Sequence, residues 1–207
     1  MMRIGVISDT HGLLREEVLE ILRGCDYILH GGGINNRGVL DTLEQIAPVY
    51  AVRGNNDKEW AEHLPHDLTV QLEDQKIFMV HNKKEIQNLP SDADIVIFGH
   101  SHKYFEQVID GKLWLNPGSC GKRRLGQEIS FAVLTIDGEI IRCRRSFCRR
   151  HRSEQILQML GASDKSAHPL LWKVYFEQKE QNCCKPYKRS AHENLKYKFI
   201  EFVRFAT

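Results

Sequence analysis

The chain has 207 residues, of which 42% are hydrophobic and 27% are charged, and its formal net charge is +2. This composition is ordinary for a globular protein, and the length suits one α/β domain with an appendage. The small net charge excludes a purely electrostatic nucleic-acid binder, and no apolar run approaches the roughly 20 residues of a membrane-spanning helix.

The first quarter of the chain alternates strand and helix patterns. Short apolar strands are predicted at 3–9, 26–30 and 48–55, and helical periodicity occurs over 13–25 and 36–47. This β-α-β-α-β order predicts parallel strands with the helices packed outside them.

Hairpins follow in the middle of the chain. They are predicted around Asp74-Gln75, Asp110-Gly111 and Asp137-Gly138, and residues 92–102 contain a buried strand. Parallel strands followed by hairpins predict two facing sheets, with helices covering their outer faces.

The character of the sequence changes after about residue 150. Residues 153–162 have a helical pattern, and 161–207 is basic and rich in aromatic residues. We therefore predict a domain at 1–160 and an extension at 161–207 that packs on it as helices, although 195–202 also alternates like a strand.

Four short motifs at the ends of predicted strands carry the candidate chemistry. They are "SDTHG", "RGNND", a histidine after "KIFMV", and "GHSH", and they contribute Asp9, His11, Asn55, His81, His100 and His102. In an extended chain, residues two apart point the same way, so each Asp/His or His/His pair can aim at one point. Imidazole combined with carboxylate and amide oxygen suits Mn, Fe, Zn or Ni better than Ca or Mg.

The order "DTH", "GNND", "VH", "GHSH" resembles the calcineurin-like metallophosphoesterases, and "NPGS" at 116–119 resembles their YfcE-type bacterial phosphodiesterase branch. The resemblance covers about residues 1–150. It implies a four-layer α-β-β-α sandwich of two facing mixed β-sheets with a two-metal centre. The implied ligands are Asp9, His11 and His102 for one metal, and Asn55, His81 and His100 for the other.

The stretch "HGGG" at 30–33 departs from this family pattern. In the family the second strand ends in a G-D motif whose Asp bridges the two metals, and Gly33 falls at that position. A nucleotide-binding phosphate loop is not favoured, because no Lys-Ser/Thr pair follows. Two divalent ions about 3.7 Å apart repel by roughly 18 kcal/mol at an effective dielectric constant of about 20. Loss of the bridging carboxylate therefore predicts one well-bound metal and one weakly bound metal.

The protein is predicted to be a metal-dependent phosphoesterase that hydrolyses phosphodiesters through a metal-bound hydroxide. Its activity is expected to be weak because Gly33 replaces the bridging Asp. Asn56 and Arg53 are assigned catalytic roles, and Asn56, Gly118 and Ser119 border the substrate. Many relatives have at the position of Asn56 a His that acts as a general acid. Because Asn cannot donate a proton to the leaving group, leaving groups of low pKa are favoured. The cofactor is one or two ions of Mn, Ni, Zn or Fe. The alternative is a catalytically impaired scaffold of the same fold, as in the retromer scaffold subunit.

The expected partner is a small phosphate ester, with no membrane contact and with a homo-oligomer left open. Residues 142–152 hold six arginines and could attract phosphate, but Phe147 is the one aromatic among them, so nucleic acid is not predicted. Six scattered cysteines without an export signal indicate reduced thiols and a cytoplasmic location.

Overall fold

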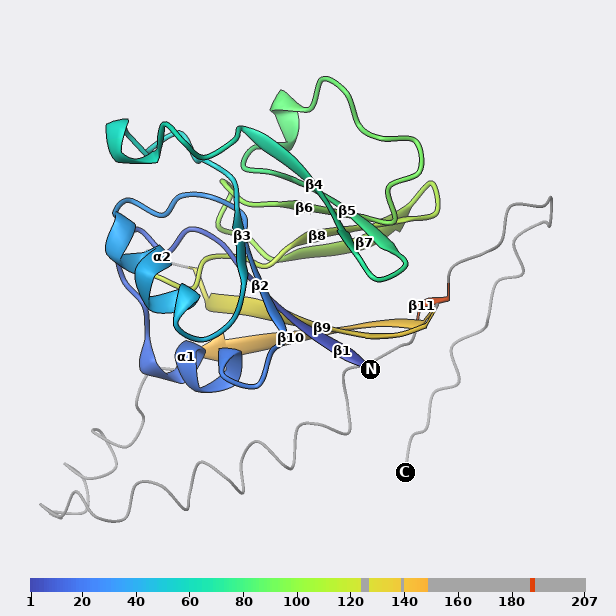
Figure 1. Cartoon of the computed structure of the whole chain (residues 1–207), viewed down its shortest axis with the longest axis horizontal. Helices are drawn as coiled ribbons and strands as arrows, with labels where there is room; N and C mark the ends of the chain where they lie inside the picture. Colours follow the sequence, from blue (N-terminus) through green and yellow to red (C-terminus); the bar gives the residue numbers. More distant parts are fainter. Residues whose placement is uncertain (124–126, 139, 149–186, 189–207) are drawn as a thin grey trace, which may run out of the picture.

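Two facing β-sheets form the body of the protein (Figure 1), which a computed structural model describes for residues 1–123, 127–138, 140–148 and 187–188. The first sheet has the order β11 (Tyr187–Lys188), β10 (Ile140–Cys148), β9 (Ile129–Asp137), β1 (Met2–Ile7), β2 (Tyr27–His30), β3 (Val49–Ala51). The second has the order β4 (Asp67–Leu72), β5 (Gln75–Val80), β6 (Ile95–Phe98), β8 (Lys112–Asn116), β7 (Phe105–Ile109). Both sheets are mixed, as predicted.

The predicted β-α-β-α-β unit builds one half of the first sheet. Strands β1, β2 and β3 pair in parallel, and α1 (Glu16–Leu22) and α2 (Arg37–Glu44) connect them. Helix α2 begins at Asn36, whose side chain accepts the backbone N–H of Val39 at 3.2 Å, a normal N-cap. Both helices are shorter than their apolar periodicity suggested, because the flanking residues form the turns that return the chain to the sheet.

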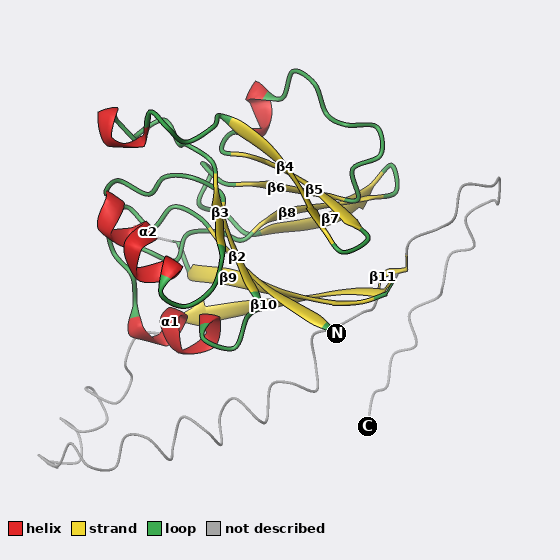
Figure 2. Cartoon of the chain, viewed as in Figure 1, coloured by secondary structure: helices red, strands yellow, loops and turns green. Residues whose placement is uncertain are grey.

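Alternating side chains divide the apolar residues between three layers. On β5, Ile77 and Met79 face the first sheet and join the core between the sheets, whereas Phe78 and Val80 face outward. Helices α1 and α2 cover the outer face of the first sheet. Helices were predicted on the outer face of the second sheet as well, but in the described part of the chain this face is covered by the loop that follows β5 and by the single 3₁₀ turn of that loop, η2 (Lys83–Glu85) (Figure 2).

The three predicted hairpins are present, and two of their turns are displaced by one residue. The β9–β10 turn begins at Gly138, one residue after the predicted start, because Asp137 still pairs with Ile140. The β4–β5 turn is formed by Glu73 and Asp74, one residue before the predicted position, and Glu73 has a left-handed φ of 50°. The β7–β8 turn is at Asp110-Gly111 as predicted, with φ of 51° and 73°, which matches a two-residue hairpin turn.

The predicted helical segment 153–162 and the predicted extension at 161–207 lie outside the described residues, except for residues 187 and 188. These two form β11, which pairs antiparallel with β10 through Ile141 and Tyr187. Packing of the rest of the extension stays a prediction. Among the helices that the structure describes, none is both long enough and apolar enough to cross a bilayer.

Candidate metal centre

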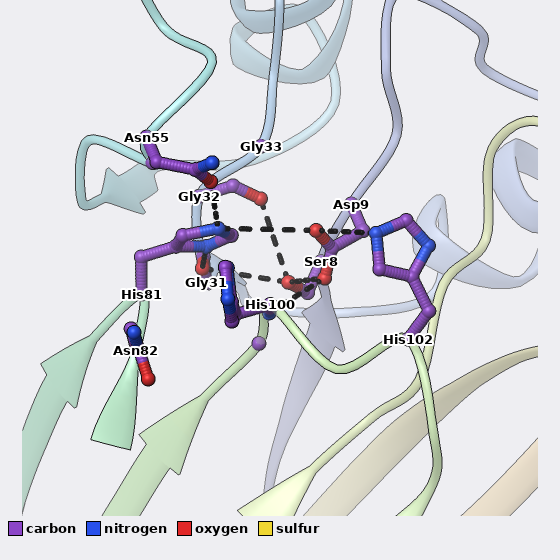
Figure 3. Close-up of polar contacts among 12 residues, drawn as sticks. Ser8, Asp9, Gly31, Gly32, Gly33, Asn55, His81, Asn82, His100 and His102 are labelled. Carbon is purple, nitrogen blue, oxygen red and sulfur yellow. Dashed lines mark hydrogen bonds and ion pairs between the residues drawn. The ribbon is translucent and has the colours of Figure 1, made fainter. Parts of the chain in front are cut away.

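All six predicted ligands lie in loops that follow the carboxyl ends of strands. Asp9 and His11 follow β1, His81 follows β5, and His100 and His102 follow β6, while Asn55 lies in the loop after β3. Figure 3 shows Asp9 and His102 facing the group formed by Asn55, His81 and His100. The two sheets therefore bring residues up to 93 positions apart, Asp9 and His102, to one place.

The first cluster consists of Asp9, His11 and His102, which are all buried and whose ligand atoms lie within 4.8 Å of one another. The His102 Nε2 atom is 3.2 Å from Asp9 Oδ1 and 3.2 Å from His11 Nε2. Two ligand atoms about 2.1 Å from one ion lie roughly 3.0 to 3.4 Å apart at octahedral to tetrahedral angles. The third separation, from His11 Nε2 to Asp9 Oδ1, is wider at 3.7 Å. These three side chains could hold a metal ion.

Hydrogen bonds orient the rings of the two clusters. Asn35 Oδ1 lies 3.3 Å from His11 Nδ1, and the carbonyl oxygen of Gly31 lies 2.7 Å from Nδ1 of His81. Since each Nδ1 atom donates its proton to an oxygen, each Nε2 atom presents its lone pair to the centre. This is the usual support for a metal-binding histidine.

The second cluster consists of Asn55, His81 and His100. Asn55 Oδ1 is 3.1 Å from His81 Nε2, and the His81 and His100 rings meet edge to face with centroids 5.3 Å apart. In the tautomer that donates its Nδ1 proton to Gly31, the Nε2 lone pair of His81 lies beside the Asn55 carbonyl oxygen, and a cation bound by both atoms relieves their repulsion. Asn55 and His100 are exposed, unlike the residues of the first cluster.

The carboxyl group of Asp9 is 1% exposed and ionised. Burial alone would raise its pKa, but hydrogen bonding from His102, the charges of His81 and His102, and the Ser8 hydroxyl together lower it below the usual value. Its Oδ2 atom accepts from Ser8 Oγ at 2.8 Å and from the backbone N–H of His100 at 3.0 Å. A fixed anion therefore stands at the centre of the site.

The expectation that the Asp/His and His/His pairs are extended is wrong. Asp9, His11, His100 and His102 have left-handed φ values of 52°, 47°, 68° and 57°. Strands β1 and β6 end before these residues, and the backbone then turns tightly. As a result the GHSH pair separates, with His102 beside His11 and His100 beside His81. Left-handed non-glycine residues are uncommon and concentrate at functional sites.

Asp57 is a buried carboxylate whose role the sequence did not suggest. It accepts four backbone N–H groups, from Gly33 at 3.0 Å, Ile34 at 2.8 Å, Asn35 at 2.6 Å and Gly54 at 2.8 Å. Gly54 packs so closely that a Cβ atom there would lie 2.3 Å from the Gly33 nitrogen. Asp57 thus joins the glycine loop after β2 to the loop that carries Asn55.

A second buried polar contact lies beneath the glycine loop. The fully buried His30 accepts the Gly32 N–H through Nδ1 at 3.1 Å, and its Nε2 atom lies 3.0 Å from Thr10 Oγ1. Burial lowers the pKa of His30 from 6.5 to about 4, although Asp57 and Asp9 oppose this shift. His30 is therefore a neutral structural residue at neutral pH.

This gives a prediction for acid stability. The folded pKa of His30 lies below the unfolded value, so the unfolded chain binds the proton more readily. We expect the free energy of unfolding to fall by about 3 kcal/mol between pH 6.5 and pH 4 on account of His30. Urea unfolding of chelator-treated protein at several pH values measures this. His30→Asn retains an acceptor for Gly32 but does not titrate, and an unchanged pH slope in that variant would contradict the assignment.

The predicted substrate residues occupy different environments. Asn56 is exposed, whereas the Arg53 guanidinium is 2.6 Å from Nε2 of His66. Gly118 and Ser119 are buried, and the Ser119 hydroxyl donates to the carbonyl oxygen of Asp9 at 2.8 Å. Ser119 thus positions the Asp9 loop, and a substrate contact by the "NPGS" segment stays a prediction.

The facing sheets and the buried Asp/His cluster at their strand ends define an α/β sandwich with a candidate metal centre. The chain belongs to the calcineurin-like phosphoesterase superfamily, whose domain matches residues 2–139. The predicted family, fold and hydrolase class are therefore confirmed.

Known relatives agree with this assignment. The probable metallophosphoesterase of Methanothermobacter thermautotrophicus is 34% identical over 167 residues, which cover 72% of this chain and 96% of that protein. The phosphodiesterase YfcE of Escherichia coli strain K12 is 30% identical over 164 residues, which cover 66% of this chain and 89% of that protein. The crystal structure of Chaetomium thermophilum Vps29 matches with a TM-score of 0.65 at 22% identity, covering 74% and 92% of the two chains, and shows the shared fold.

Proposed function

We propose that this protein hydrolyses phosphodiesters with the help of divalent transition-metal ions. The observation that carries the proposal is the first cluster, in which a buried carboxylate and two imidazoles point their ligand atoms at one another from 3.2 to 3.7 Å. Asp9, His11 and His102 would hold the first ion. Nitrogen and carboxylate donors favour Mn, Fe, Ni or Zn, and the choice among them, like a cytoplasmic location, stays a prediction.

Asn55, His81 and His100 would hold a second ion more weakly. The contact of Asn55 with His81 and the edge-on rings of His81 and His100 support this half-site. None of its ligands carries a negative charge and two of them are exposed, so the attraction for a cation is lower than beside Asp9.

The bound ions would supply a water molecule of lowered pKa and positive charge for the phosphoryl oxygens. The chain's own residues hold this arrangement in place. Gly31 and Asn35 fix the rings of His81 and His11, and Ser8 and Ser119 fix Asp9. Asn56 cannot donate a proton as an acid, so esters with good leaving groups, such as aryl phosphodiesters, are the favoured substrates.

Gly33 would stand where a carboxylate bridges the two ions in relatives. A Cβ atom at Gly33 would lie 2.7 Å from Asp9 Oδ1 and 3.3 Å from His81 Cε1, between the two clusters. This position supports the proposed replacement of the bridging residue by glycine. A site without that carboxylate would bind the second ion weakly and turn over slowly.

The test is hydrolysis of a bis-aryl phosphodiester by metal-stripped protein reloaded with Mn, Ni, Zn or Mg. We expect turnover with at least one transition metal, little with Mg, and a slower rate for esters with alkyl leaving groups. The metal content of each sample is measured in parallel. Turnover that is independent of added metal, or equal for both kinds of ester, would contradict the proposal.

A scaffold that has lost catalysis is the second candidate, and the glycine at position 33 favours it. In that case the same assay would give metal binding without turnover for any metal. The six remaining ligand side chains favour the enzyme, because a site released from catalysis has no physical reason to keep buried histidines with their rings oriented.

A further inference from the structure

We propose that Asp9 Oδ1 is shared by both half-sites, so that Asp9 itself takes over the bridging position left empty at Gly33. The inference rests on the proposed function, because it concerns the same metal centre. It changes the role of Asp9 from a ligand of one ion to the common ligand of two.

The first argument is that the two carboxylate oxygens of Asp9 have separate tasks. Oδ2 is occupied by the hydroxyl of Ser8 and the backbone N–H of His100. Gly99 closes this side, since a Cβ atom there would lie 2.9 Å from Oδ2. Oδ1 is therefore the oxygen of Asp9 that faces the histidines.

The second argument is that Oδ1 lies between the clusters. It is 3.2 Å from His102 Nε2 and 3.7 Å from His11 Nε2 in the first cluster, and 4.0 Å from His81 Nε2 in the second. Two atoms that bind one ion at about 2.1 Å can be at most about 4.2 Å apart. All three distances are within this limit, so Oδ1 can share an ion with ligands on either side.

The third argument concerns the space beside Gly33. A side chain at that position would begin 2.7 Å from Oδ1 and 3.2 Å from the Asp9 Cα atom. The backbone of the glycine loop thus lies directly against Asp9, and Oδ1 is the nearest atom to the first side-chain atom that position 33 could carry. A single shared oxygen still leaves the pair of ions with less negative charge than two carboxylates provide.

The experiment is calorimetric titration of metal-stripped protein with Mn(II), comparing Asp9→Asn with variants of each cluster alone. In Asp9→Asn, the Ser8 and His100 donors require an acceptor, so the amide oxygen takes the place of Oδ2 and the amide nitrogen faces the ions. We expect the affinity at both sites to fall by at least the roughly 10- to 100-fold that loss of a supporting residue costs a metal site.

His11→Ala and Asn55→Ala are the matched controls, and each should weaken one Mn(II) equivalent and leave the other. The shared role is overturned if Asp9→Asn loses one equivalent and binds the other with wild-type affinity, or if the wild-type protein binds a single ion.

Electron paramagnetic resonance of the wild type gives a second measurement that does not depend on variant folding. Two ions that share an oxygen give an exchange-coupled spectrum, and separate six-line signals overturn the inference. Turnover of the wild type with one bound ion would contradict the shared role of Asp9 but retain the proposed function. Absence of any Mn(II) binding would contradict both the shared role and the proposed function.

Discussion

Asp57→Ala is expected to lower the free energy of unfolding by about 4 kcal/mol, because four buried backbone N–H groups lose one carboxylate acceptor. Hydrogen bonds to a charged group contribute about 1.5–3 kcal/mol each, but relaxation and water entry recover part of the sum. The donors are Gly33, Ile34 and Asn35 in one loop and Gly54 in another. Denaturant unfolding of metal-free protein measures the loss.

Asp57→Asn keeps the shape of the side chain and removes its charge, so it measures the contribution of the charge to stability. The amide retains one acceptor oxygen but presents an NH₂ group to the remaining N–H donors, so about 2 kcal/mol should be lost. Asp41→Asn is the control, since Asp41 is 54% exposed and pairs with Arg37 on the surface of α2. That substitution should change stability by less than about 0.5 kcal/mol. Equal effects at the two positions would show that Asp57 does not clamp the loops.

The hydrogen bonds of Asp57 to both loops also affect metal binding. Asp57 joins the loop of Asn55 to the glycine loop, whose Gly31 carbonyl orients His81. Release of this connection would separate Asn55 from His81 and weaken the second half-site. The first cluster would be affected through Asn35, because Asp57 accepts the Asn35 N–H and the Asn35 Oδ1 atom orients His11, while Ser8 and Ser119 would still hold Asp9.

Local patterns in the sequence predicted much of the fold. The β-α-β-α-β alternation gave the parallel strands β1 to β3, and the Asp110-Gly111 pair gave the β7–β8 turn. The cover over the second sheet was harder to predict, because the apolar residues Ile86 and Leu89 pack on it from a loop without helical periodicity. Segments that pack through a few irregularly spaced apolar side chains show no hydrophobic periodicity in the sequence, so they are not recognised from it.

The residue types of the candidate ligands showed where a site could form, but the contacts that position these residues were not predictable from the sequence. Asp57 in "RGNND" has the sequence signature of an ordinary turn residue, and its four acceptor contacts exist only because Gly54 and Gly33 approach closely in the folded chain. His30 ended an apolar strand and gave no sign that its Nδ1 atom supports Gly32. His100 and His102 also have a left-handed backbone, and the N–H of His100 donates to Asp9 in the loop after β1, which is a contact between distant segments that no local pattern encodes.

Gly33→Asp is expected to tighten the binding of the second metal ion and to raise phosphodiester turnover, at a cost to the metal-free protein. Gly33 has a φ of 73°, and an added Cβ atom would lie 2.7 Å from Asp9 Oδ1. A left-handed non-glycine residue costs roughly 1–2 kcal/mol, with Asp and Asn at the low end. In the metal-free state the new carboxylate also repels Asp9, so the melting temperature should fall.

Gly33→Asn is the matched control, because it has the same shape and the same backbone requirement but no charge. Without metal, the Asn variant should be the more stable of the two, since it does not repel Asp9. With saturating Mn(II) the order should reverse, because binding to the folded state stabilises it in proportion to the affinity. A negative charge beside two cations lowers their mutual repulsion, and an amide does not.

If Mn(II) raises the melting temperature of both variants equally, position 33 does not lie between the ions. If Asp raises the affinity for the second ion without raising turnover, a carboxylate at position 33 is not what limits catalysis, and the scaffold becomes the better account of this chain.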